Sequence, residues 1–204
     1  MDYTSLGVQI QKYANRTDAM FIEQIPNFII QAMSRIYSEA KSLGFEIKTV
    51  GYLVENQAFI GKPANWKETI SFAIINNTEF SYLLPRSEEF GRTYWPMSTQ
   101  TDFPLFYSDS NYSNFLLFPT PNSSYPVQLI YRGLPQFNAE APENFLTQRY
   151  PNLLLYACMV EATPFLKDDE RVPVWSSFYD RELQNVNRDL QITYVDRTSK
   201  RDAN

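Results

Sequence analysis

The stretch NLLLYACMVEATPFLKDDERVPVW, residues 152–175, decides the fold because two different helical patterns meet within it. Its first nine residues are almost entirely apolar, and a helix that is apolar on every side has to be buried among other elements. Pro164 lacks the amide hydrogen that the carbonyl of Val160 needs, so this helix must kink or stop there. The charged residues 167–171 then turn the chain, and Pro173 fits the first turn of a second helix. The stretch therefore predicts an αα-hairpin.

Stripes of apolar residues at helical spacing predict further helices around this hairpin. The second helix of the hairpin has the inward stripe Trp175, Tyr179, Leu183, Val186 and Leu190. A long helix in the N-terminal third has the stripe Ile29, Met33, Ile36, Ala40 and Leu43. Pro26 fits the first turn of that helix, and Gly44 fits its C-terminal cap. A shorter helix, capped by Thr4 or Ser5, precedes it and carries Leu6, Ile10 and Tyr13.

The middle of the chain changes to a period of two, which is typical of β-strands with one buried face. In TISFAI, residues 69–74, this pattern predicts Ile70, Phe72 and Ile74 on one face. Asn76 and Asn77 fit a turn into the next strand.

Two other segments complete this middle region. NFLLFPTPNSSYPVQLIYRGLP, residues 114–135, is predicted to form a second hairpin around its proline-rich loop. PRSEEFGRTYWP, residues 85–96, is expected to be a short helical or irregular insertion. Because the region has no helix long enough to connect parallel strands, antiparallel pairing is favoured.

The sequence therefore predicts an α+β protein, in which N- and C-terminal helices form an α-helical bundle around an inserted antiparallel β-rich domain. The bundle is expected to comprise residues 1–44 and 134–190. The inserted domain is expected to span residues 45–133, and residues 191–204 are expected to form a separate C-terminal tail.

Composition favours a globular protein without a membrane segment. Hydrophobic residues make up 44% of the 204 residues and charged residues 20%. The longest apolar run, around Cys158, is far shorter than the roughly 20 residues that cross a bilayer, and Cys158 is expected to be buried there. The first residues lack the features of an export signal, so folding in the cytoplasm is expected. The net charge of −5 argues against sequence-independent binding of DNA.

The residues available for catalysis are few. The chain has no histidine, one cysteine and six glycines, and these glycines form no phosphate-binding loop. We therefore predict no catalytic residue, cofactor or metal site, and no enzymatic activity. A hydrolase that uses carboxylates alone stays open as the weakest alternative, with the candidates Glu88, Glu89, Asp102 and Asp109. A second acidic cluster is interpreted as helix-capping rather than cation-binding, and comprises Asp168, Asp169 and Glu170.

Aromatic residues gather in the middle region, where we predict packing either in the core or at a subunit interface, and four of them are candidates for contact with a partner. The candidates are Tyr94, Trp95, Phe106 and Tyr107. Arg86 and Arg92 accompany these rings, which is too little basic charge for a nucleic-acid platform. With Asp102 and Asp109, the same rings leave open a carbohydrate- or host-receptor-binding module of a virion.

The C-terminal tail is interpreted either as a disordered terminus or as an arm that orders on a partner. Its apolar anchors and basic residues are Ile192, Tyr194, Val195, Arg197, Lys200 and Arg201.

Three segments, in this order, resemble the head-to-tail adaptor proteins of tailed bacteriophages, which are also called neck or connector proteins. They are IPNFIIQAMSRIYSEAKSLGFE (25–46), LLFPTPNSSYPVQLIYRGLP (116–135) and YPNLLLYACMVEATPFLKDDERVPVWSSFYDRELQNVN (150–187). The resemblance implies a structural virion protein with a helical bundle and an inserted β-rich domain. It implies assembly in the host cytoplasm and a place in the neck of the virion.

The resemblance also implies partners. Adaptors of this kind form a ring, commonly of twelve copies, beneath the portal protein. The ring presents a surface to the next neck or tail protein, such as a nozzle, a terminator or a tube. In several such proteins a C-terminal extension grips the portal, and here that extension would be Gln191–Asn204. A negatively charged ring would let DNA pass through its channel without specific binding.

Overall fold

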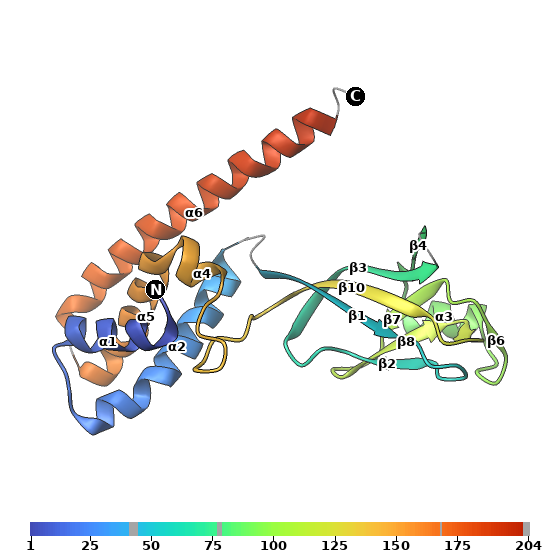
Figure 1. Cartoon of the computed structure of the whole chain (residues 1–204), viewed down its shortest axis with the longest axis horizontal. Coiled ribbons are helices and arrows are strands. Elements are labelled where there is room, and N and C mark those ends of the chain that lie inside the picture. The colour runs from blue at the N-terminus through green and yellow to red at the C-terminus, as the bar shows by residue number, and fades with distance from the viewer. Residues whose placement is uncertain (41–44, 77–78, 168, 202–204) are drawn as a thin grey trace. The chain divides into compact units, whose positions relative to one another are not determined.

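A computed structural model describes residues 1–40, 45–76, 79–167 and 169–201. The chain divides into two compact units, which are shown in Figure 1. The helical unit takes in Met1–Phe45 and Leu134–Asn204, and the β unit takes in Glu46–Gly133. Terminal helices with a central, mainly antiparallel β-rich region confirm the predicted α+β class.

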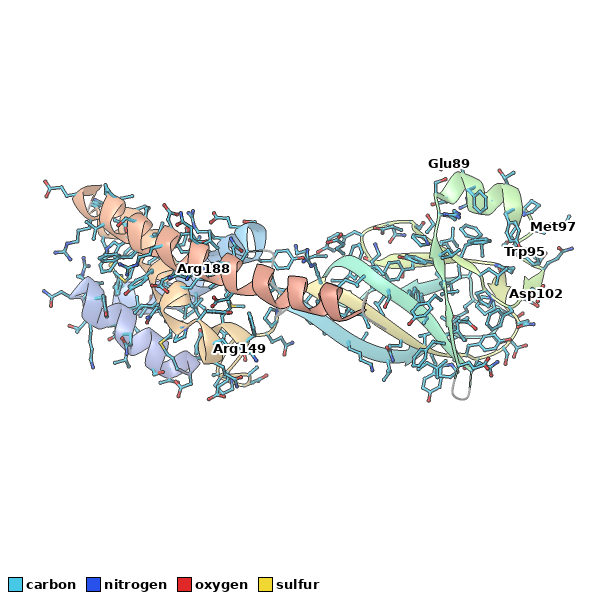
Figure 2. The ribbon with its side chains drawn as sticks, turned by 90° about the horizontal axis from the view of Figure 1, so that it is seen from above. Glu89, Trp95, Met97, Asp102, Arg149 and Arg188 are labelled. Carbon is cyan, nitrogen blue, oxygen red and sulfur yellow. The ribbon has the colours of Figure 1, made fainter. Side chains whose placement is uncertain are left out.

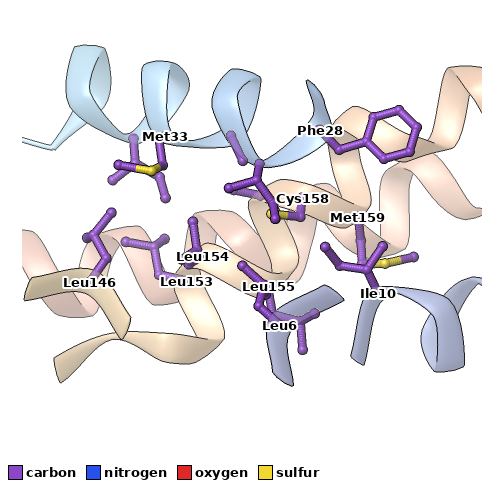
Figure 3. Close-up of a cluster of buried hydrophobic side chains, with 14 of the residues drawn as sticks. Leu6, Ile10, Phe28, Met33, Leu146, Leu153, Leu154, Leu155, Cys158 and Met159 are labelled. Atoms are coloured by element: carbon purple, nitrogen blue, oxygen red, sulfur yellow. The ribbon is translucent and has the colours of Figure 1, made fainter. Parts of the chain in front are cut away.

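The helical unit is built around one helix, α5. Its elements are α1 (Tyr3–Ala14), α2 (Ala19–Glu39), α4 (Phe145–Arg149), α5 (Pro151–Leu166), the 3-10 helix η2 (Asp169–Arg171) and α6 (Val172–Arg201). Helices α1, α2, α4 and α6 all pack against α5. Figure 3 shows side chains of α1, α2, α4 and α5 meeting in this core. The buried residues of α5 lie on all its sides, as predicted, and Cys158 is buried among them.

The predicted αα-hairpin is present, with α5 and α6 as its two helices. Helix α5 continues two residues past Pro164 and ends at Leu166. Lys167 then adopts a left-handed conformation with φ 54°, and its amide donates to the carbonyls of Thr163 and Pro164. Pro173 lies in the first turn of α6, as predicted. The backbone of α6 continues without a break past Leu190, where the sequence pattern predicts a separate tail.

Polar contacts join the three longest helices of this unit. The guanidinium of Arg35 on α2 lies 2.6 Å from a carboxylate oxygen of Glu161 on α5. The hydroxyl of Tyr179 on α6 donates to Glu39 on α2 at 2.7 Å. Burial and the neighbouring Glu39 carboxylate raise the pKa of Tyr179. These contacts help to fix the relative rotation of helices that otherwise meet through a largely apolar core.

The start of α2 differs from the prediction, because Pro26 lies inside the helix and not in its first turn. A carboxylate oxygen of Asp18 accepts a hydrogen bond from the amide of Phe21 at 3.2 Å, so the helix begins at Ala19. Phe21 is also buried, which extends the inward stripe toward the N-terminus. Pro26 cannot donate to the carbonyl of Ile22, but Ile22 is 41% exposed, so water has access to this turn.

Two other predicted helix ends also differ. Helix α1 is capped by Asp2, whose carboxylate accepts from the amide of Ser5 at 2.7 Å, while the Ser5 hydroxyl accepts from the amide of Asp2. This reciprocal pair places Ser5 inside the helix, not at its cap. Helix α2 ends at Glu39 with Ala40 as its cap residue. The predicted cap Gly44 lies outside the described residues.

The β unit consists of two four-stranded sheets, one two-stranded sheet and a short helix. The first sheet has the order β1 (Glu46–Tyr52), β10 (Pro126–Gly133), β3 (Trp66–Asn76), β4 (Glu79–Tyr82) and is antiparallel throughout. The second has the order β2 (Phe59–Gly61), β8 (Asn114–Phe118), β7 (Phe106–Asp109), β5 (Leu84–Pro85). Among the residues that the structure describes in this unit, parallel pairing is confined to β5 with β7 and to the two-residue strands β6 (Thr101–Asp102) and β9 (Thr120–Pro121). Helix α3 (Glu88–Tyr94) confirms the predicted insertion.

The two sheets share one apolar core. The ring of Phe72 in the first sheet lies 5.5 Å from that of Tyr107 and 5.6 Å from that of Phe115, both in the second sheet. The buried members of this core are Leu53, Phe72, Ile74, Leu83, Tyr107, Phe115, Leu117, Val127, Leu129 and Tyr131. Core residues therefore come from strands that are far apart in the chain.

The predicted second hairpin is wrong. Strand β8 pairs with β2 and β7, whereas β10 pairs with β1 and β3, so the two strands lie in different sheets. Pro119 and Pro121 in the connecting segment have no amide hydrogen to donate to a ladder, and the chain crosses between the sheets there.

The predicted alternation along β3 fails at Ile70, which is 47% exposed. The register with β10 shifts at this point, since Ile130 lies opposite Ser71 but Tyr131 lies opposite Thr69. The extra residue is a β-bulge, which changes the side of the sheet that the following side chains occupy. The predicted turn after β3 lies partly at Asn77, outside the described residues.

Candidate functional site

Helix α3 has clear local reasons to form within the β unit. The Ser87 hydroxyl accepts a hydrogen bond from the amide of Phe90 at 3.3 Å and caps the first turn. Glu88 and Glu89 follow in that turn, where the helix dipole favours negative charge. Glu88 also pairs with Arg92, one turn later, at 2.6 Å.

A glycine lets α3 lie directly on strand β8. A Cβ atom at Gly91 would lie 2.0 Å from the ring of Phe118, far closer than any real contact. The helix can therefore approach this closely only with glycine at position 91. Phe118 is buried, and α3 packs on β7 and β8.

Where α3 packs on the second sheet, three aromatic residues cluster with a leucine and an arginine at the protein surface. We call this cluster the α3 surface: Leu84, Arg86, Phe90, Tyr94 and Phe106. The rings of Phe90 and Tyr94 are parallel within 4°, with centroids 6.1 Å apart. Both rings meet Phe106 edge-on, at 5.4 and 5.2 Å. The Arg86 guanidinium lies 5.6 Å from the Phe90 ring and 5.7 Å from the Phe106 ring.

The α3 surface has the chemistry of a protein-docking surface. Phe90 is 42% exposed, Tyr94 44% and Leu84 48%, and Leu84 lies opposite Phe106 in the strand pairing. Aromatic residues and arginine are enriched at the centres of protein interfaces, where they account for much of the binding energy. The mutual ring contacts hold these side chains in place before a partner arrives, which lowers the entropy cost of binding.

The structure separates the four aromatic residues proposed from the sequence. Tyr94 and Phe106 belong to the α3 surface. Trp95 ends α3, and its indole nitrogen donates to the carbonyl of Gln100 at 3.0 Å; Figure 2 shows it near Met97. Tyr107 is 7% exposed and points into the core, because neighbouring strand residues face opposite sides. Its selection as an interface residue is therefore corrected, and burial raises the pKa of its hydroxyl.

Two members of the α3 surface, Phe90 and Leu84, were missed from the sequence. Phe90 and Tyr94 are four residues apart, a spacing that places them on the same face of a helix, so the sequence signal for this pair was present. Leu84 and Phe106 lie on strands that pair only in the folded chain, and the sequence carries no comparable signal for them.

Three of the four carboxylates proposed for a hydrolase or a sugar site, Glu88, Asp102 and Asp109, have partners within the chain. Asp109 forms an ion pair with Lys62. Glu88 is hydrogen-bonded by Arg92 and Ser110, which lower its pKa. Asp102 accepts from the amide of Phe103 at 2.7 Å.

These acids are also spread over the β unit. Figure 2 places Glu89 at the opposite end of α3 from Trp95, whereas Asp102 lies in strand β6. Tyr107 is buried in the core and Asp109 is paired with Lys62, so neither is free to join the sugar-binding site that the sequence left open as an alternative.

Lys62 is a charged residue that is buried within the β unit. Its side chain is 2% exposed, and its ammonium lies 3.9 Å from the Trp66 ring and 5.0 Å from the Phe115 ring. It also donates to the carbonyl of Asn111 at 2.6 Å. The ammonium of Lys62 is therefore occupied by partners within the chain and is not available to a ligand.

The remaining sequence-based candidates lie toward the C-terminal end of α6. Ile192, Tyr194, Val195, Arg197, Lys200 and Arg201 fall within its helical backbone. In the acidic cluster, Asp168 lies outside the described residues. Among the residues that the structure describes, no group of His, Cys, Asp or Glu residues could hold a metal ion. Within the same part of the chain, no helix is long and apolar enough to cross a membrane.

Comparison with protein families gives the class of the protein. The family model described as SU10 adaptor protein matches residues 1–201, so it spans both units. The protein is a bacteriophage adaptor, a structural component of the virion that interacts with other head or tail proteins. The chain belongs to the SU10 adaptor protein family, which confirms the resemblance seen in the sequence. No curated protein matches it.

Proposed function

We propose that this protein forms a ring beneath the portal of a tailed phage capsid and joins the portal to the next neck or tail protein. The family match across residues 1–201 is the observation that supports this role most strongly. Twelve copies would match the portal, and the next component would be a nozzle, a terminator or a tube. The ring would be added to the virion in the host cytoplasm and would catalyse no reaction.

Two surfaces are proposed to dock these partners. The α3 surface would bind a neighbouring neck protein through its exposed rings and Arg86. The end of α6, from Gln191 to Arg201, would bind the portal, because it carries apolar and basic residues on a continuous helical backbone. DNA would pass through the ring unbound, since each copy adds a net charge of −5 to the assembly.

Imaging of the full chain mixed with its cognate portal ring tests the proposal. We expect electron microscopy to show a symmetric extra layer on one face of each portal ring. Portal rings that stay bare at adaptor concentrations well above the portal concentration would overturn the proposal. The ring is expected to form on the portal even if the free chain is monomeric.

Two matched pairs of variants test which of the two surfaces binds which partner. Tyr94→Ala should weaken binding of a neck protein by about tenfold or more, the usual cost of losing an interface anchor. Tyr112→Ala is its control, because Tyr112 is 88% exposed and lies outside the α3 surface. A chain that ends at Leu190 should lose portal binding, whereas a chain that ends at Arg201 should retain it. Equal binding within either pair would remove that surface from the proposal.

A further inference from the structure

Within the described part of the chain, the first sheet of the β unit ends in two edge strands, β1 and β4, at opposite ends of its strand order (Figure 1). Strand β1 is seven residues long, and its register with β10 runs from Glu46 to Tyr52 without a shift. Proteins protect such edges with proline, bulges, charged side chains or very short strands. Glu46–Tyr52 contains no proline and no bulge, and its charged residues, Glu46 and Lys48, lie in its first half. The second half, from Thr49 to Tyr52, is therefore a regular uncharged edge to which another strand can add.

The two edges have matching directions. Strand β1 is antiparallel to β10, β10 to β3, and β3 to β4. Three successive reversals make β4 antiparallel to β1. When a second copy lies beside the first in the same orientation, its β4 meets the free edge of β1 as an antiparallel neighbour, and the sheet continues without a change of pattern.

The two edges also expose matching side chains on the same face. Val50 lies opposite Gln128, Gln128 opposite Ala73, and Ala73 opposite Tyr82, so one row of side chains crosses the sheet from edge to edge. Directly opposed residues share a face. Val50 is 68% exposed and Tyr82 63%, so this row ends in an exposed apolar side chain at both edges.

A second row of side chains also ends in an exposed apolar residue at both edges. Tyr52 on β1 is 69% exposed, and Phe80 on β4 is 48% exposed and lies opposite Ile75 of β3. On the other face, the residues between these positions are small, namely Gly51 on β1 and Ser81 on β4. Pairing of the two edges would therefore cover apolar side chains on one face and bring no bulky groups into collision on the other.

We infer that neighbouring copies of this chain meet edge to edge, with β4 of one copy adding to β1 of the next and extending the first sheet across the contact. The contact uses two different surfaces, so each copy keeps one free edge and the arrangement propagates until it closes into a ring. This inference rests on the proposed ring and names the strands through which its copies touch.

Engineered cysteines test the contact, because the chain has one native cysteine, and it is buried. The double variant Val50→Cys/Tyr82→Cys places a thiol at each edge of the same row. Thiols on paired neighbouring strands lie within disulfide reach, so a mild oxidant should join copies into a ladder of dimers, trimers and larger products. Tyr52→Cys/Phe80→Cys tests the same register at the neighbouring row. Val50→Cys/Phe80→Cys and Tyr52→Cys/Tyr82→Cys cover registers shifted by one row in either direction.

The matched control is Val50→Cys/Ile70→Cys. Ile70 is 47% exposed but lies on the inner strand β3, so its thiol is accessible and away from both edges. This variant should give no ladder above the level of the single variants. A ladder of the same length in the control would show random collision and would overturn the inference.

The oxidation is run both on the free chain at high concentration and on the chain bound to portal. If the portal is decorated but none of the four edge pairs forms a ladder in either sample, the inference fails and the proposed function stands. If the portal stays bare but the free chain forms the ladder, the proposed function fails and the sheet contact stands. Cross-linking of β1 to a different neck protein would also overturn the inference, because another partner would then occupy the edge.

Discussion

The two units bury their apolar residues in different ways. In the helical unit one helix, α5, lies at the centre and the other helices pack against it. In the β unit no single segment is central, and the core forms where residues of two sheets meet, as Phe72 meets Phe115. The helical core therefore depends on one continuous segment, whereas the β core depends on pairings between distant segments. The units should consequently respond separately to substitutions.

The largest effect is expected from Phe72→Ala, at the centre of the β core. Phe72 is 2% exposed, and truncation of a buried phenylalanine costs about 3–5 kcal/mol. Hydrogen exchange should show faster opening throughout Glu46–Gly133 and little change in α5. The control is Phe80→Ala in the same sheet, where the ring is 48% exposed and the cost should be small. Equal destabilisation of α5 by Phe72→Ala would refute separate cores.

Leu154→Ala is the corresponding change in the helical unit. Leu154 is fully buried in α5, and such truncations cost roughly 2–5 kcal/mol. Exchange should accelerate in α1, α2 and α5, whereas the strands of the β unit should keep their protection. Ile30→Ala is the control, because Ile30 is 61% exposed on α2. If the strands of the β unit open together with α5, the two units unfold as one.

Gly91→Ala should destabilise the β unit by about 1–3 kcal/mol, because the added methyl group overpacks against Phe118. Its control is Gly61→Ala, where nothing lies within 4 Å of the added Cβ and the change should be close to neutral. Chemical denaturation of the two variants measures the difference. Gly91→Ala should also weaken binding through the α3 surface, and unchanged stability and binding would contradict the seating of α3.

The smallest effect is expected from Tyr179→Phe, which removes the hydrogen bond to Glu39 and should cost roughly 1 kcal/mol. Because the folded state raises the pKa of Tyr179, its hydroxyl stabilises the fold fully below the ordinary tyrosine pKa of about 10. This contribution is lost as pH rises toward the higher folded-state pKa. Unfolding curves of the wild type and Tyr179→Phe should therefore converge above pH ~10, and a constant difference would contradict this role.

The contrast between the units also explains which features the sequence predicts. Helix burial depends on local periodicity, so the stripe through Ile29, Met33 and Ile36 and the all-round burial of α5 were predicted correctly. Pro26 was placed wrongly, because an exposed carbonyl tolerates the lost hydrogen bond inside a helix. Errors in the helical unit are thus confined to the ends of helices.

In the β unit the errors concern pairing, which local sequence does not encode. Nothing in residues 114–135 reveals that β8 and β10 pair with strands from elsewhere in the chain. The bulge that exposes Ile70 depends on the partner strand β10. The same limit applies to the proposed interface residues. Composition singles out Tyr94, Phe106 and Tyr107 alike, and only the packing of the sheets shows that Tyr107 points into the core.

Hydrogen exchange of the full chain, alone and with its cognate portal ring, tests most directly the central claim that this protein acts by docking. With portal present, exchange should slow in α6 from Gln191 to Arg201 and in β1 and β4, whereas amides in the centre of α5 should be unchanged. Identical exchange in the two samples, at concentrations that would saturate the portal, would contradict the account.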